Sequence, residues 1–220
     1  MLSVLLAAAL GAGAVPFPAP GTYRYAASMS GRDIGAWSVS VSRDATATEV
    51  DEDSTASIMG MQLAAKASLV LGPDLAPTRY AGNYVTPGQS PNVSVTLTPT
   101  SATVAGAFSD RPQQVGLNAN TRHFVVIEPG LLAGLFALPA QLEAWRDSAV
   151  TWITPTTAQA QSLTTGAQTA VPRPAGAAPG DTLLSIDRPI AVTIWYDPAT
   201  LVPDAIVVPS QNAVLTRQRP

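Results

Sequence analysis

The strongest constraint on the fold is a two-residue alternation of apolar and polar side chains in the first half of the chain. It is clearest in residues 37–41 (WSVSV) and 93–97 (VSVTL), and similar runs occupy residues 22–29, 63–71, 78–85 and 102–108. This period is typical of β-strands with one buried and one solvated face. Short turns join the runs, such as Ser30–Asp33 and the reversal around Gly60. Parallel pairing would need long crossovers, so the pattern predicts an antiparallel meander. Glycines within the strands, such as Gly82, indicate a curved sheet.

The alternation stops in the second half of the chain. Leu131, Leu135, Leu138, Leu142 and Trp145 recur at spacings of four and three, which predicts one apolar helical stripe. Pro139 lies within this segment and is expected to divide it into two short helices. Further strands are expected at residues 150–154, 189–196, 203–208 and 213–217, after a flexible Ala/Pro/Gly-rich loop at 168–181. The predicted fold class is mainly β (α+β), with one or two short helices on a curved antiparallel sheet.

Residues 1–14 (MLSVLLAAALGAGA) are typical of a signal peptide. The apolar run is too short to span a bilayer. It ends in a small-residue cleavage pattern, Ala12–Ala14, and prolines at 16, 18 and 20 prevent a helix from continuing. We therefore expect export to the periplasm or the extracellular space, with a mature single domain at 15–220 and no transmembrane anchor. The alternative is a buried N-terminal helix.

Composition excludes several classes of function. The chain has no cysteine, so disulfides, thiolate metal sites and cysteine nucleophiles are absent. Its net charge is −3 and it has no basic stripe, which argues against nucleic-acid binding. It also lacks a phosphate loop and a dinucleotide-binding fingerprint.

The sequence contains no catalytic constellation. His123 is the single histidine, and a Ser-His-Asp triad would have to combine it with Asp110 or Asp197. No G-x-S-x-G motif presents a serine, and Asp197 precedes a proline, as is usual for an acid that begins a turn. We therefore expect a structural histidine, no cofactor and no enzymatic activity.

Alternating acidic residues mark one further segment. Glu49, Asp51 and Asp53 would share one face of a strand, and carboxylate oxygens are the ligands that calcium prefers. The segment lacks the glycine-punctuated loop of a calcium motif. A charged strand that discourages edge-to-edge aggregation is the simpler interpretation, and no metal dependence is expected.

Aromatic residues on neighbouring strands are the best candidates for a binding site, although they could equally form ordinary core under the helices. A ligand pocket would use the apolar face of the strands and the leucine stripe that covers it. The candidate pocket residues are Tyr23, Tyr25, Trp37, Val39, Tyr80, Tyr84, Leu131, Leu135 and Leu138.

Three short motifs carry a family resemblance. They are the opening strand GTYRY at 21–25, the segment LAPTRYAGNY at 75–84, and VTIWYDP at 192–198 followed by PDAI at 203–206. Together they resemble uncharacterised exported bacterial domains related to the lipoprotein localisation factors (LolA/LolB-like). The resemblance implies a strongly curved antiparallel sheet, an unclosed barrel, with helices over its concave face. In the best-understood members that concavity holds acyl chains. No catalytic residue is implied, and the modified cysteine of membrane-anchored members is absent, which favours a soluble form.

These observations lead to two functional hypotheses. The first is a soluble exported envelope protein that binds a lipid or another apolar small molecule. The alternative is a structural or interaction protein of the cell envelope, with a filled sheet, no ligand and another envelope protein as its partner. A void or a packed concave face would distinguish the two.

Overall fold

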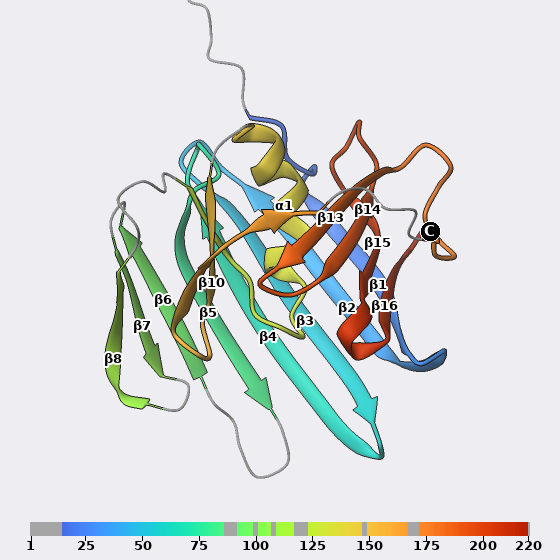
Figure 1. Cartoon of the computed structure of the whole chain (residues 1–220), viewed down its shortest axis with the longest axis horizontal. Helices are drawn as coiled ribbons and strands as arrows, with labels where there is room; N and C mark the ends of the chain where they lie inside the picture. The colour runs from blue at the N-terminus through green and yellow to red at the C-terminus, as the bar shows by residue number, and fades with distance from the viewer. Residues whose placement is uncertain are drawn as a thin grey trace, which may run out of the picture.

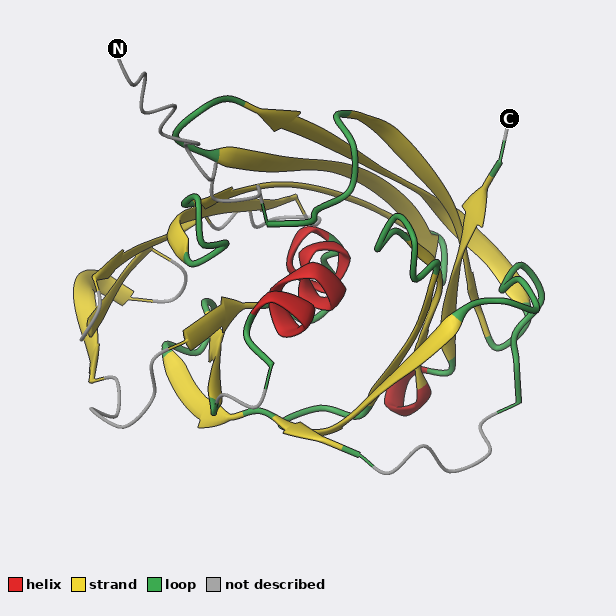
Figure 2. Cartoon of the chain, turned by 90° about the horizontal axis from the view of Figure 1, so that it is seen from above, coloured by secondary structure: helices red, strands yellow, loops and turns green. Residues whose placement is uncertain are grey.

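The computed structural model describes residues 15–85, 92–98, 101–106, 109–116, 123–146, 149–166 and 172–219. The expected signal peptide and its cleavage site therefore lie outside the described residues. Most of the described chain forms one antiparallel 13-stranded sheet that curls around a helix without closing into a barrel (Figures 1 and 2). The predicted fold class, a curved antiparallel sheet with a helix over its concave face, is confirmed.

The first half of the sheet is a meander whose first seven strands were predicted, whereas the eighth was not expected. Its strands follow chain order: β1 (Gly21–Met29), β2 (Arg32–Arg43), β3 (Thr48–Ile58), β4 (Met61–Leu71), β5 (Pro77–Val85), β6 (Asn92–Thr98), β7 (Ser101–Gly106) and β8 (Ser109–Gly116). The C-terminal strands extend the sheet from the other side of β1, in the order β16 (Ala213–Gln218), β15 (Pro203–Val208), β14 (Val192–Tyr196), β13 (Thr182–Arg188) and β12 (Thr164–Thr165). Because β16 pairs with β1, the two ends of the described chain meet in the middle of the sheet.

The C-terminal region differs from the prediction in three strands. The strand expected to begin at Pro189 begins at Val192, and neither β12 nor β13 was expected. Within the predicted loop, residues 172–181 contain no helix or strand, and 168–171 lie outside the described residues. Flexibility of this loop stays a prediction.

A second, smaller sheet contains a parallel pair that the sequence did not indicate. β9 (His123–Val126) pairs parallel with β10 (Val150–Thr154), and β11 (Gln159–Ser162) pairs antiparallel with β10. Parallel strands need a long crossover, and the helix α1 (Ala133–Ala144) provides it. β9 was missed because it is short and its sequence, HFVV, does not alternate.

The helix α1 departs from the prediction in two respects. It is one continuous helix that includes Pro139, so the expected division into two helices is wrong. It also has no solvated face over its first nine residues, because Ala133–Gln141 are all buried. Burial on every side stabilises the helix enough to offset the hydrogen bond that an internal proline removes. No helix among the described residues is long and apolar enough to cross a membrane.

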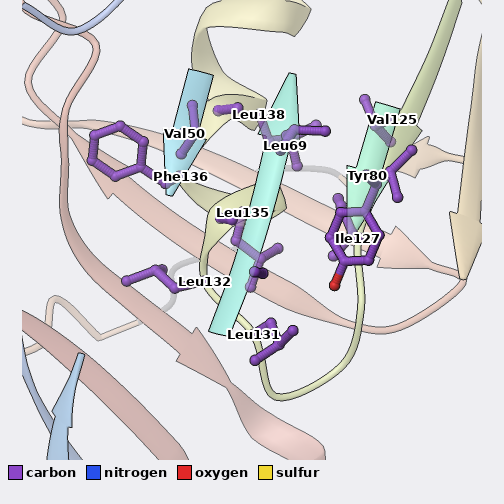
Figure 3. Close-up of a cluster of buried hydrophobic side chains, with 14 of the residues drawn as sticks. Val50, Leu69, Tyr80, Val125, Ile127, Leu131, Leu132, Leu135, Phe136 and Leu138 are labelled. Carbon is purple, nitrogen blue, oxygen red and sulfur yellow. The ribbon is translucent and has the colours of Figure 1, made fainter. Parts of the chain in front are cut away.

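The inner face of the long strands packs against α1 to form the core (Figure 3). Val50 from β3, Leu69 from β4 and Tyr80 from β5 are at most 1% exposed, and they meet Leu138 of the helix in the same buried cluster. Gly134 allows this close packing, because a Cβ atom there would lie 2.2 Å from the carbonyl oxygen of Val126. The core therefore lies between the concave sheet and α1.

Three hairpin turns gather at one end of the sheet. The β1–β2 turn and the β15–β16 turn are joined by a hydrogen bond of 2.8 Å from the Ser30 N–H to the Asn212 carbonyl. The β3–β4 turn, at Met59 and Gly60, lies at the same end, because Gly35 near the start of β2 pairs with Ala56 near the end of β3. The segment that leads into α1 also faces this end.

Candidate ligand-binding cavity

A cavity of about 450 Å³ lies on the concave side of the sheet, at the end where the hairpin turns gather. Its walls come from β1–β4, from β15, β16 and the turn between them, and from the segment that enters α1. The lining residues are Ala27, Met29, Ile34, Trp37, Ser54, Ala56, Ile58, Leu63, Ala64, Ala65, Pro129, Gly130, Leu131, Leu132, Leu135, Val208, Gln211, Ala213 and Leu215. None of these described residues is charged, and most are aliphatic. A volume of this size is within the range of small-molecule sites.

The strand register explains why space remains here. Trp37 of β2 lies opposite Ser54 of β3, which lies opposite Ala65 of β4. Farther along the same face the side chains are larger, such as Val50 and Leu69, and they fill the gap to α1. The small side chains of Ser54 and Ala65 therefore leave a void that α1 borders through Leu135 but does not fill.

The mouth of the cavity is formed by the loop before α1 and by the β15–β16 turn. Pro129, Gly130 and Gln211 are exposed lining residues, whereas Leu131 and Leu132 just beyond them are buried. Glu128 fixes the base of this loop, since its carboxylate accepts hydrogen bonds from the backbone N–H of Thr156 at 2.8 Å and from its hydroxyl at 2.7 Å. The loop is therefore held in place on one side and open to solvent on the other.

A buried carboxylate lies beside the inner end of the cavity. Glu52 is 3% exposed, and its Oε2 accepts hydrogen bonds from the N–H groups of Leu132, at 2.6 Å, and Ala133, at 2.8 Å. It thus caps the N-terminus of α1 from a neighbouring strand. Burial raises the pKa of Glu52 to about 7, although the two backbone N–H groups act in the opposite direction. Its Oε1 is buried and has no hydrogen-bond partner.

Glu52 was not predicted as a buried residue beside the site, although the alternation along β3 indicates that it faces inward. Glu49, Asp51 and Asp53 alternate along β3, so the residues between them must face the other way. The burial pattern of β3 confirms this inward face, which includes Val50, Glu52 and Ser54. An acidic residue on the apolar face of an alternating strand is the feature that could have identified it.

Trp37 is the second buried polar group at the cavity. The structure places two other indoles in hydrogen bonds: Trp145 Nε1 donates to the Asp74 carbonyl at 2.9 Å, and Trp152 Nε1 donates to the Ile127 carbonyl at 3.1 Å. Trp37 Nε1 is buried and has no partner, while its ring forms part of the cavity wall.

The predicted pocket residues divide into those that line the cavity and those that do not. Trp37, Leu131 and Leu135 line it. Tyr25, Val39, Tyr80 and Leu138 are buried in the core outside the lining, Tyr23 is half-buried with its ring 5.1 Å from that of Phe136, and the side chain of Tyr84 lies outside what the structure describes. A ligand-binding role for any of them stays a prediction.

The structure assigns ordinary structural contacts to the other polar candidates. His123 stacks on Trp145, with ring centroids 4.6 Å apart. Asp197 begins a turn as expected and accepts hydrogen bonds from the Ala199 N–H and the Thr200 hydroxyl, both at 2.9 Å. The side chain of Asp110 is outside the described residues.

The acidic residues of β3 face the outside of the sheet. Asp53 forms an ion pair of 3.0 Å with Lys66, and Glu49 accepts a hydrogen bond of 2.9 Å from Ser68. No group of three or more acidic or histidine side chains that could hold a metal occurs in the described part of the chain. The expectation that the protein does not depend on calcium stays a prediction.

A larger hollow of about 710 Å³ crosses the same outer face, over β2–β7. It is lined by small and polar residues, including Ser38, Ser40 and Asn83, and it lacks the enclosing apolar walls of the inner cavity. The inner cavity is therefore the better candidate site.

The fold and the cavity together define a β-barrel-like protein: an open, curved antiparallel sheet that surrounds one helix and leaves an uncharged void at one end. No protein-family model and no curated protein matches the sequence. Among solved structures, the chain is similar to a β-barrel-like protein of a domain of unknown function, DUF1849, from Brucella abortus. The TM-score is 0.57 at 10% identity, with 93% of this chain and 97% of that chain covered. A DUF1089 family protein from Pseudomonas aeruginosa matches with a TM-score of 0.46 at 7% identity, over 76% of this chain and 87% of that one. The first likeness shows the fold alone, and the second is too distant to carry an argument.

Proposed function

We propose that this protein is an exported binding module of the cell envelope, which holds a lipid or another apolar molecule in the cavity of its concave face. The observation that carries the proposal is the uncharged, mostly aliphatic lining of that cavity. An apolar ligand gains about 0.8 kcal/mol for each methylene group that it buries against such a wall. Affinity should therefore rise with chain length until the cavity is filled.

Two further observations support the proposal. Residues 1–14 have the pattern of a signal peptide, which supports the export component. The open curved sheet, with a helix on its concave side, is the arrangement expected for a relative of the lipoprotein localisation factors. We propose that relationship on the fold and the three short motifs.

The test is a titration of the purified, delipidated protein with diphenylhexatriene, a hydrocarbon whose fluorescence rises in apolar surroundings. Saturable binding is expected. Ala65→Phe should abolish it, because Ala65 lies in the lining and the added ring would occupy the void. The matched control is Ala81→Phe, the same substitution on the outer face of the sheet, which should leave binding unchanged.

The alternative function predicts a different result. A structural or interaction protein without a ligand would show no saturable binding of the probe, and no lipid would be found by mass spectrometry of the protein purified from its native host. Equal binding by Ala65→Phe and Ala81→Phe, with both variants shown to be folded by circular dichroism, would place the probe elsewhere and overturn the proposal.

A further inference from the structure

The structure also bears on the chemical class of the ligand. We propose that it is an amphiphile with an uncharged head group, whose hydroxyl or carbonyl oxygen accepts a hydrogen bond from Trp37 Nε1 inside the cavity. This inference rests on the proposed function and deepens it.

The first argument comes from Trp37. Its Nε1 is a donor that is closed off from solvent and has no partner, and an unpaired buried donor is costly. The indole is 9% exposed and lies in the cavity wall, directly opposite Ser54 in the β2–β3 register. The Ser54 hydroxyl already donates to the Ala65 carbonyl at 3.2 Å. Because Nε1 is closed off in this structure, the ring must turn to present it to the cavity, and a ligand oxygen there would then satisfy the donor.

The second argument concerns charge. A buried carboxylate or phosphate head group would need a cation, and the described residues of the lining include no lysine, arginine or histidine. Glu52 lies two residues from Ser54 on the same inward face of β3, and its carboxylate would repel an anion. The cavity therefore favours a neutral head group over a fatty acid or a phospholipid anion.

A cationic head group is disfavoured for a related reason. Glu52 is not part of the lining, and its Oε2 is already engaged by the N–H groups of Leu132 and Ala133. Its Oε1 has no partner but is closed off from solvent, so an ammonium group at the wall would lose its hydration without forming a direct ion pair.

The experiment is a competition assay with diphenylhexatriene as the reporter and three ligands of equal chain length: decanol, decanoate and decylammonium. At pH 8, decanol should displace the probe at the lowest concentration. Trp37→Phe keeps an apolar ring and removes the donor. It should weaken decanol by roughly three- to tenfold, the range expected for one neutral hydrogen bond. The loss for decanol is measured relative to any change for diphenylhexatriene, which has no polar atom and reports only the effect of the smaller ring on the apolar wall.

Trp195→Phe is the matched control. Trp195 Nε1 is also buried without a partner, but this residue is not in the cavity lining. Its substitution should leave decanol binding unchanged. Tighter binding of decanoate or decylammonium than of decanol, or equal effects of the two tryptophan substitutions, would overturn the inference while leaving the binding function intact. If diphenylhexatriene itself does not bind, the proposed function fails, and this inference fails with it.

Discussion

Replacement of Glu52 by glutamine should remove a large part of the pH dependence of stability. Burial raises the pKa of this carboxyl group in the folded protein to about 7, from an ordinary value of 4.5. A folded-state pKa above the unfolded value means that the folded protein binds more protons between these two values. Stability is therefore highest below about pH 4.5, decreases as the pH rises through 7, and is constant above it with respect to this group.

The magnitude follows from the two pKa values. Each pKa unit corresponds to 1.36 kcal/mol, so ionising Glu52 in the folded state costs about 3 kcal/mol. Part of the cost arises because Oε1 has no hydrogen-bond partner, whereas Oε2 is satisfied by the first N–H groups of α1. Glutamine retains an oxygen for those N–H groups and cannot ionise.

The measurement is urea unfolding of the wild type and of Glu52→Gln at a series of pH values from 4.5 to 8.5. The wild-type free energy of unfolding, taken relative to the variant, should fall by about 3 kcal/mol across this range. Glu49→Gln, on the outer face of the same strand, is the control and should retain the wild-type slope. Parallel curves for the wild type and Glu52→Gln would refute the reasoning, because Glu52 would then titrate equally in the folded and unfolded states.

Three further results are expected. Gly134→Ala should destabilise the protein by about 1–3 kcal/mol, since its Cβ would lie 2.2 Å from a β9 carbonyl oxygen. Gly116→Ala, whose Cβ would meet no atom within 4 Å, should be neutral, and thermal melting of the two variants measures the difference. Leu138→Ala should lower the free energy of unfolding by about 2–5 kcal/mol, and Leu135→Ala should lower it less because Leu135 borders the cavity. Equal losses for the two variants in urea unfolding would contradict this. Sequencing the N-terminus of the native protein should show that it begins near Val15, and a retained initiator methionine would refute cleavage of a signal peptide.

The meander was predictable because its strands carry one apolar and one polar face. The alternation in residues 37–41 and 93–97 identifies β2 and β6 directly, and the turn at Ser30 and Gly31 separates β1 from β2. The same rule failed for β9, whose residues Phe124, Val125 and Val126 are all buried. A strand buried on both faces has no alternation to detect.

The helix shows a different limit. The apolar spacing located it correctly, but its surroundings were set by the whole sheet. Periodicity alone predicted one buried stripe, whereas α1 lies inside the curl of the sheet and is buried on every side from Ala133 to Gln141. Pro139 is tolerated because packing that is distant in sequence surrounds it.

The candidate site was predictable only in part. Trp37, Leu131 and Leu135 were expected on the cavity wall and lie there. The void itself depends on small residues, such as Ser54 and Ala65, that lie opposite each other only when β3 and β4 pair. Such residues carry no signal in an unaligned sequence.

The pairing of β1 with β16 has a consequence for how the chain acquires this fold. Arg24 pairs with Gln218, so one edge of β1 has no partner until nearly the whole chain has been synthesised. Strands β1–β8 can form hairpins in sequence, each as soon as its neighbour is free to fold. The joining of β16 to β1 instead depends on a contact of very high sequence separation, which slows folding. Until that contact forms, β1 presents an open hydrogen-bonding edge on which copies of the nascent chain can aggregate. A chaperone that shields this edge would raise the yield of folded protein more than one that binds the β6–β8 side.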